Sequence, residues 1–170
     1  VRVAFDLDRT SLLHMDYGAI EAELHAIPKA QRTHRDVSDA VIRIRQSKLP
    51  DPQKIGNAGS FFKNPTVPAE LARKLVRDHP NMPQYPLPDG RVKLAAGWMI
   101  DQVGWKGHKR KTHGVHDKQA LVLVHFGGAT GSDIWQLAED IMDSIKQRFG
   151  IDLEPEVNQV SIPHKGGTEA

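Results

Sequence analysis

The sequence predicts an α+β protein in which helices pack on a mainly antiparallel sheet. Residues 33–49 and 133–149 repeat apolar residues at helical spacing, as amphipathic helices do. Between them, the apolar run Ala120–Val124 is typical of a strand that is buried on both faces. We expect helices beginning near Thr33, Val92 and Asp133 to cover a sheet with strands near Phe61, Leu121 and Leu153.

Composition limits the class of protein. The chain has 170 residues, of which 39% are hydrophobic and 26% are charged. No apolar run reaches the roughly eighteen residues that span a bilayer. The formal net charge of +2 is mild, and the absence of cysteine excludes disulfides and thiolate metal sites. We therefore expect one soluble domain with an appendage, without a membrane partner.

The first residues predict a strand followed by a linker. Val1–Leu7 alternates apolar and polar residues, and Ile20, Ala22 and Leu24 indicate a short helix. The chain starts inside a strand pattern without an initiator methionine. We therefore expect it to be the end of a longer protein, with residues 1–32 closing a preceding domain.

The next helix has clear boundaries. Thr33 can cap it with Asp36 at the capping-box distance, and it must end before Pro50. A further helix is expected to start within Val67–Glu70, with Pro68 in its first turn. The prolines from residue 80 to residue 88 predict a long, stiff loop without regular structure. A third helix is expected over residues 92–103, with Trp98 as a packing residue.

The glycine-rich stretch 56–65 holds the main candidate for chemistry. Glycines at 56 and 59 permit positive φ and close backbone approach, so they can hold the Ser60 hydroxyl at the edge of a pocket. The alternative is a tight turn into a short buried strand, with Phe61 and Phe62 in the core. Spacing alone favours the turn.

The basic stretch 106–116 suggests a phosphate-binding loop or a histidine metal cluster. Its histidines follow no recognised zinc spacing, so we expect no metal and interpret the stretch as a mobile surface loop. Interleaved aromatic residues that would stack bases are missing, which disfavours nucleic-acid binding. Gly127–Ser132 is not a phosphate loop either, because the lysine expected after its last glycine is absent.

The C-terminal part predicts one helix and one strand. The helix runs from about Asp133 to Phe149 and is stopped by Gly150. A strand over residues 151–157 would point Glu154 and Glu156 to the same side, either into solvent or into a pocket. Residues 165–170 are expected to be a disordered tail.

Six ordered blocks of the chain closely resemble the C-terminal part of the UDP-N-acetylenolpyruvoylglucosamine reductase family, the MurB reductases of peptidoglycan synthesis. The blocks are Lys48–Pro52, Gly56–Pro65, Lys93–Trp98, Val115–His116, Gln119–Val124 and Leu153–Val157. The resemblance implies an α+β substrate-binding domain of this type over residues 33–164. It also implies that FAD-binding domains of the same protein precede this region.

The resemblance implies a cytoplasmic bacterial enzyme in which NADPH reduces bound FAD and the flavin then reduces UDP-N-acetylglucosamine enolpyruvate to UDP-N-acetylmuramate. By motif, Ser60 matches the serine that protonates the intermediate, and Glu156 matches the glutamate beside it. Lys48, Asn64 and Gln119 match substrate-binding positions. The cofactor-binding residues are expected upstream, so the chain alone should be inactive, without bound FAD or NADPH.

This chain departs from the family pattern in two places. It has His125 where the family often has asparagine, and its loop from His108 to His113 is more basic than the family pattern. Two other functions stay open. A stand-alone module could bind the UDP-sugar without catalysis, and the discriminating observation is whether flavin absorbance accompanies the purified protein. A nucleic-acid-binding protein would show retention on DNA that falls steeply with salt.

Overall fold

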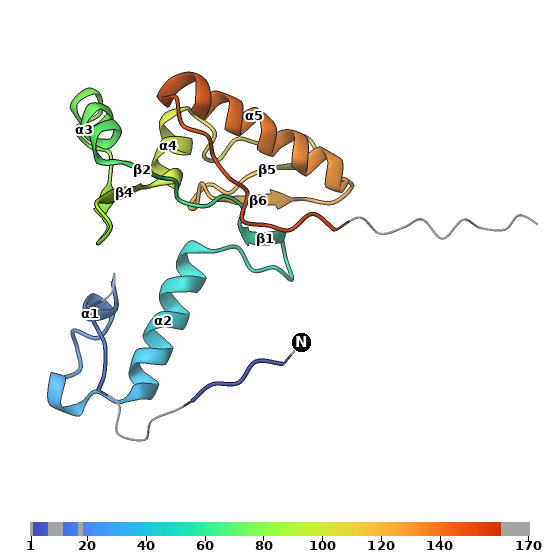
Figure 1. The fold of residues 1–170 in the computed structure, drawn as a ribbon. Coiled ribbons are helices and arrows are strands. Elements are labelled where there is room, and N and C mark those ends of the chain that lie inside the picture. The colour runs from blue at the N-terminus through green and yellow to red at the C-terminus, as the bar shows by residue number, and fades with distance from the viewer. Residues whose placement is uncertain (1, 7–11, 17–18, 161–170) are drawn as a thin grey trace, which may run out of the picture. The chain divides into compact units, whose positions relative to one another are not determined.

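The computed structural model describes residues 2–6, 12–16 and 19–160, which divide into a first compact unit ending at Leu49 and a second beginning at Pro50. Helices and antiparallel sheets make up the fold (Figure 1), so the predicted α+β class is confirmed. The compact units divide after Leu49, whereas the substrate-binding domain is expected to begin at residue 33. That assignment stays a prediction, and the expected tail at 165–170 lies outside the described residues.

The first unit contains α1 (Ile20–Glu23), a 3₁₀ helix at Lys29–Gln31 and α2 (His34–Lys48). The predicted capping box of α2 is confirmed. The Asp36 amide donates to the Thr33 hydroxyl at 3.2 Å, and the Thr33 amide donates to the Asp36 carboxylate at 2.8 Å. These bonds satisfy amide groups that a helix start leaves without partners.

A buried arginine holds the chain between α1 and α2. The Arg32 side chain is only 4% exposed and pairs with Glu21 at 2.9 Å. Its other nitrogens donate to the carbonyl oxygens of Leu24 at 3.0 Å and Ile27 at 2.9 Å. The hydrogen bond from Arg32 also lowers the pKa of the Glu21 carboxyl. Because these bonds satisfy several donors of one guanidinium, the charge can be buried in a very small core.

Two antiparallel sheets of three strands form the second unit. The first sheet has the order β1 (Gly56–Ser60), β6 (Val122–His125), β5 (His113–Val115). The second has the order β2 (Thr66–Pro68), β4 (Arg91–Leu94), β3 (Gln84–Pro86). The predicted strand near Leu121 corresponds to β6, whose residues 122–124 are buried.

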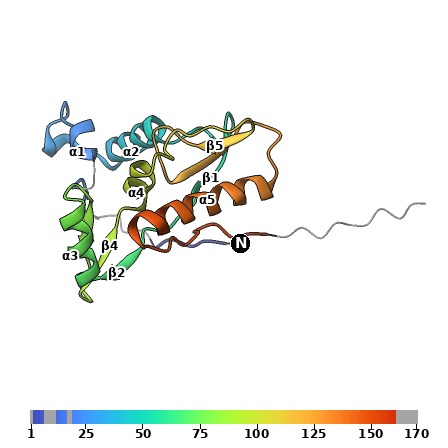
Figure 2. The same ribbon diagram turned by 90° about the horizontal axis from the view of Figure 1, so that it is seen from above.

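Three helices cover these sheets. They are α3 (Ala69–Asp78), α4 (Ala96–Gln102) and α5 (Gly131–Phe149). α3 packs on β2 and β4, which lie beside it in both views (Figures 1 and 2). α5 packs on β5 and β6, as Figure 1 shows. Gly150 ends α5 with φ of 68°, as predicted. No helix among the described residues is long and apolar enough to cross a membrane.

The prediction of a helix over residues 92–103 is wrong for residues 92–95. Residues 91–94 form the central strand β4, in which Val92 and Leu94 are buried and Arg91 and Lys93 are exposed. This alternation has the period of a strand, and only Ala96–Gln102 is helical. Trp98 packs against the rings of His79 and Phe149 at centroid distances of 6.0 Å, which confirms its packing role.

Three other predictions, two of strands and one of an irregular loop, need correction. Residues 151–157 form only a single bridge, between Pro155 and Phe62. The Phe61 amide, which would continue the pairing, donates to the Leu121 carbonyl instead. In the proline-rich segment, Gln84–Pro86 is an edge strand rather than irregular loop. Of the predicted strand Val1–Leu7, residues 2–6 are described and are not a strand, and Phe5 is 79% exposed.

The basic stretch 106–116 is anchored, contrary to the expectation of a mobile surface loop. Arg110 pairs with Asp140 of α5 and lies over the Trp105 ring, 5.8 Å from its centroid. The hydrogen bond from Arg110 lowers the pKa of the Asp140 carboxyl. His113 at the start of β5 is buried, and its Nε2 atom has no hydrogen-bond partner among the described residues. Aromatic and carboxylate partners on other elements were not visible in the spacing of this stretch.

Gly114 is expected to be a position where even alanine destabilises the fold. A Cβ atom there would lie 2.4 Å from the backbone oxygen of His108, which cannot rotate away. We expect Gly114→Ala to lower the free energy of unfolding by about 1–3 kcal/mol, the usual cost of overpacking. Urea unfolding measures this loss. Gly131→Ala is the control, because a Cβ there meets nothing within 4 Å and it should change stability little.

Candidate active site

The strand β1 is irregular immediately before Ser60. Its pairing with β6 shifts register between Asn57 and Ser60, which marks a β-bulge. Gly59 has φ of 75°, and its amide donates to the side-chain oxygen of Asn57 at 3.1 Å. A glycine adopts this left-handed conformation at little cost, and bulges commonly redirect a side chain next to an active site. The bulge therefore leaves the Ser60 side chain exposed at the end of the strand.

Three segments far apart in the sequence meet beside Ser60. The Phe61 amide donates to the carbonyl of Leu121 at 2.7 Å, and the Phe61 carbonyl accepts from the Glu156 amide at 2.8 Å. Phe61 and Phe62 are buried and fix this junction in the core. The expectation of a buried aromatic pair and the expectation of a presented serine are therefore compatible.

Ser60 and Glu156 line the same open pocket, together with Ala58, Val157 and Asn158. Both side chains are exposed at its surface. Within the part of the chain that the structure describes, Glu156 forms no ion pair, so its carboxylate is available to a ligand. A hydroxyl and a carboxylate at one pocket are groups that can transfer a proton and stabilise charge.

An adjoining compartment shares Ala58, Val157 and Asn158 with this pocket. It extends to the start of α5, where Trp135 contributes an apolar surface. The Trp135 ring lies 6.2 Å from the Phe61 ring between centroids. The Ser60 pocket is therefore polar on one side and opens onto aromatic side chains on the other.

The other predicted residues of the second unit, Asn64 and Gln119, both lie at the start of α4. The Asn64 side-chain oxygen accepts from the Ala96 amide at 2.9 Å, which satisfies a free donor of the first helical turn. The Gln119 side-chain oxygen would lie 3.7 Å from a Cβ at Gly97, in that same turn. The structure thus brings these two amide side chains to one place.

Lys48 belongs to the first unit. It is the last residue of α2 and its side chain is exposed, in a helix end whose carbonyl groups favour a cation. Its role in substrate binding stays a prediction.

Sequence reasoning missed the residues that organise the pocket. Asn57 shapes the turn before Ser60, and the Asn-x-Gly spacing at 57–59 is a signal that could have identified it. Lys63 forms an ion pair with Glu154, so of the two nearby carboxylates only that of Glu156 is left for a ligand. Asn158 lines the pocket, but nothing in its local sequence distinguishes it.

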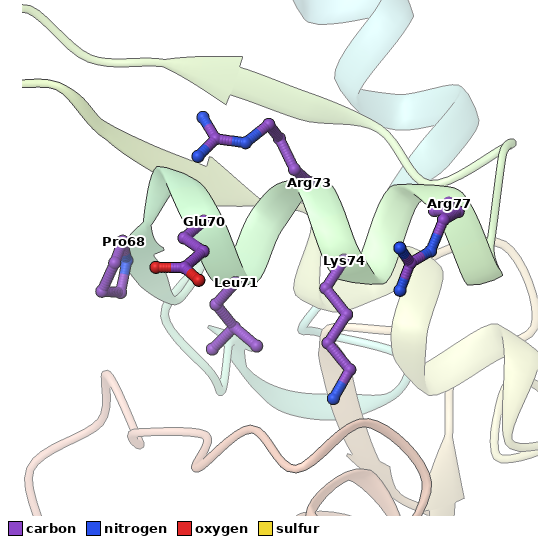
Figure 3. Close-up of a pocket in the computed structure, with 6 residues that line it drawn as sticks. All are labelled: Pro68, Glu70, Leu71, Arg73, Lys74 and Arg77. Atoms are coloured by element: carbon purple, nitrogen blue, oxygen red, sulfur yellow. The ribbon is translucent and has the colours of Figure 1, made fainter.

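A separate hollow lies on α3 (Figure 3), and it includes none of the predicted site residues. Arg73 extends to one side of the helix, whereas Leu71 and Lys74 extend to the other. Arg77 is paired with Asp78 of the same helix at 3.7 Å. Exposed charges on a helix are common, and the hollow contains the Glu70 carboxylate but no hydroxyl among its lining residues. It also contains none of the predicted site residues, so the candidate site is the Ser60 pocket.

Comparison with known proteins gives a consistent match. Residues 51–160 match the family described as UDP-N-acetylenolpyruvoylglucosamine reductase, C-terminal domain. A protein of that name from Chromobacterium violaceum is 54% identical over 154 residues, which cover 91% of this chain and 45% of the relative. One from Pseudomonas aeruginosa is 51% identical over 158 residues, covering 93% of this chain and 47% of the relative. The chain therefore spans about half the length of the curated relatives it matches.

Proposed function

Since the chain belongs to the family of UDP-N-acetylenolpyruvoylglucosamine reductase C-terminal domains, we propose that it is the substrate-binding part of an NADPH- and FAD-dependent reductase. The substrate is UDP-N-acetylglucosamine enolpyruvate and the product is UDP-N-acetylmuramate, a cytoplasmic precursor of bacterial peptidoglycan. The observation that supports this most is that Ser60 and Glu156 line one pocket although they are far apart in the sequence. A generic domain has no reason to bring a matched serine and glutamate together.

In this proposal Ser60 is the general acid. Reduced flavin, when bound by the preceding domains, supplies a hydride to the terminal carbon of the enolpyruvyl double bond. The electron pair of that double bond moves toward the carboxylate, and the Ser60 hydroxyl donates its proton to the carbon beside it. Because Ser60 is exposed, its oxygen can regain a proton from solvent.

Glu156 acts on the same intermediate. Its carboxyl group, when protonated or hydrogen-bonded, stabilises the charge that develops after hydride addition. Lys48, Asn64 and Gln119 are each proposed to bind the substrate, because a diphosphate prefers cations and amide donors.

We assign no residue of this chain to FAD or NADPH. The part of the chain that the structure describes carries no G-x-G-x-x-G fingerprint, and the expected flavin-binding domains precede it. The chain alone should therefore be colourless and inactive, and its partner is the upstream part of the same protein.

The full-length protein tests the proposal. Purified with its flavin, it should oxidise NADPH in the presence of UDP-N-acetylglucosamine enolpyruvate and form UDP-N-acetylmuramate, which mass spectrometry identifies. Binding of the UDP-sugar without turnover would support the non-catalytic module instead, and salt-sensitive retention on DNA would support a nucleic-acid-binding protein.

Asn64 is expected to bind substrate only through its amide hydrogens, because its oxygen already accepts from Ala96. Asn64→Asp keeps that oxygen but replaces the donor with a negative charge facing a diphosphate. A hydrogen bond to a charged group contributes about 1.5–3 kcal/mol, so we expect KM for the UDP-sugar to rise by at least about tenfold.

Thermal unfolding of the same variant separates binding from stability. Asn64→Asp should unfold close to the wild type, whereas Asn64→Ala leaves the Ala96 amide without its acceptor and should lose about 1 kcal/mol of stability. A normal KM in Asn64→Asp would remove Asn64 from the substrate site.

A further inference from the structure

The segment that carries Glu156 is attached to the Ser60 segment by very few bonds. The Lys63 amide donates to the Glu154 carbonyl at 2.9 Å, and the Glu156 amide donates to the Phe61 carbonyl at 2.8 Å. These two bonds surround the single bridge between Phe62 and Pro155. The Phe61 amide, which a longer ladder would direct to the Glu156 carbonyl, donates instead to the Leu121 carbonyl at 2.7 Å, so the pairing ends there.

A side-chain ion pair reinforces this attachment. The Lys63 ammonium group contacts the Glu154 carboxylate, and the two side chains are 48% and 70% exposed. The same two residues also share a backbone hydrogen bond, so the ion pair closes a second link between the segments. Glu156, two residues farther along, lines the Ser60 pocket and forms no ion pair with the described residues.

We propose that Lys63 is a positioning residue for the reductase reaction: by pairing with Glu154, it holds the Glu156 carboxyl in register with Ser60. The inference rests on the proposed function and adds a residue to it. The pair selects one of two nearby carboxylates, leaving Glu154 occupied and Glu156 available for the intermediate. Lys63 itself does not touch the substrate in this proposal.

The expected size of the effect follows from the exposure of the pair. An exposed ion pair shifts an equilibrium by no more than about fivefold, and salt weakens it. In the aligned state, the Glu156 amide is bonded to the Phe61 carbonyl, and in the open state this bond is broken. Removing the ion pair should therefore make the aligned state about fivefold less populated relative to the open state. Flavin reoxidation, the step that uses Glu156, slows only if the population of the aligned state limits its rate. The population and the rate are therefore measured separately.

The first measurement is amide hydrogen exchange at Glu156, followed by nuclear magnetic resonance on this chain without cofactors. Lys63→Met should accelerate exchange at the Glu156 amide about fivefold, because the bond to the Phe61 carbonyl opens more often. The control is Lys146→Met. Lys146 forms a similarly exposed pair with Asp152 at 2.6 Å, but neither residue lines the pocket, and its loss should not change exchange at Glu156.

The second measurement uses the full-length flavoenzyme and follows its two half-reactions by stopped flow. Lys63→Met and Glu154→Gln should each slow flavin reoxidation by the UDP-sugar up to about fivefold, with flavin reduction by NADPH unchanged. The exchanged pair, Lys63→Glu with Glu154→Lys, should restore both reoxidation and Glu156 exchange to within about twofold of the wild type.

Unchanged Glu156 exchange in Lys63→Met would overturn the proposal. So would failure of the exchanged pair to restore reoxidation, because the positive charge at position 63 would then be needed for the substrate itself. Failure of the proposed function is seen separately, as wild-type flavin that the UDP-sugar does not reoxidise. The exchange experiment still decides the structural role in that case.

Discussion

Replacing Ser60 by alanine in the full-length protein is expected to slow reoxidation of the flavin by UDP-N-acetylglucosamine enolpyruvate by about 10²-fold or more. Loss of a general acid has an effect of this size. Reduction of the flavin by NADPH should stay nearly intact, because the Ser60 proton is used only after hydride has reached the substrate. Stopped-flow measurement of each half-reaction gives the two rates directly.

Ser132→Ala is the matched control for this prediction. Ser132 lines the adjoining compartment at the start of α5, so its loss perturbs the same region without removing the proposed acid. Equal losses in both half-reactions of Ser60→Ala would indicate damage to folding or to flavin placement. Unchanged reoxidation would remove Ser60 from the mechanism.

Phe62→Ala is expected to lower the free energy of unfolding by about 3–5 kcal/mol, the usual cost of truncating a buried phenylalanine. Phe62 is 1% exposed and belongs to the large core cluster of the second unit. Its backbone also forms the bridge to Pro155, so the cavity lies directly beneath the junction of the Ser60 and Glu156 segments.

Urea unfolding followed by tryptophan fluorescence measures this loss, since all three tryptophans lie in the second unit. Phe126→Ala is the control, because Phe126 is 46% exposed and its truncation should cost well under 1 kcal/mol. Similar losses in the two variants would contradict the assignment of Phe62 to the core.

The helices of this protein could be predicted because their ends have local signals. Thr33 with Asp36 and Thr130 with Asp133 form capping boxes, although the second box was not predicted as such, and Gly150 stops α5. Each signal depends on residues within one helical turn, which sequence spacing displays directly.

The strands were harder to predict because their partners lie elsewhere in the chain. The apolar residues at 92, 94 and 95 fit both a helical and a strand period, so the sequence predicts a helix where β4 forms. Only the pairing with β2 and β3 distinguishes the two. Residues 151–157 have a strand-like sequence, but they form only one bridge, to Phe62, because the Phe61 amide pairs with Leu121 instead. Tertiary pairing decided both cases.

The site was only partly accessible from the sequence. Glycine spacing indicates that Ser60 can be presented at a turn. In the structure, Gly59 has the positive φ that this prediction requires. The partnership with Glu156 came from the family resemblance, because no local pattern connects the two segments. The hydrogen bond between the Glu156 amide and the Phe61 carbonyl depends on the folded chain.

The bulge in β1 also affects how this protein behaves in concentrated solution. β1 is an outer strand of its sheet, with β6 on one side only, and a flat outer strand offers free amide and carbonyl groups to a second molecule. The register shift and the left-handed Gly59 interrupt that free edge just before Ser60. The irregularity that exposes the serine therefore also opposes edge-to-edge aggregation.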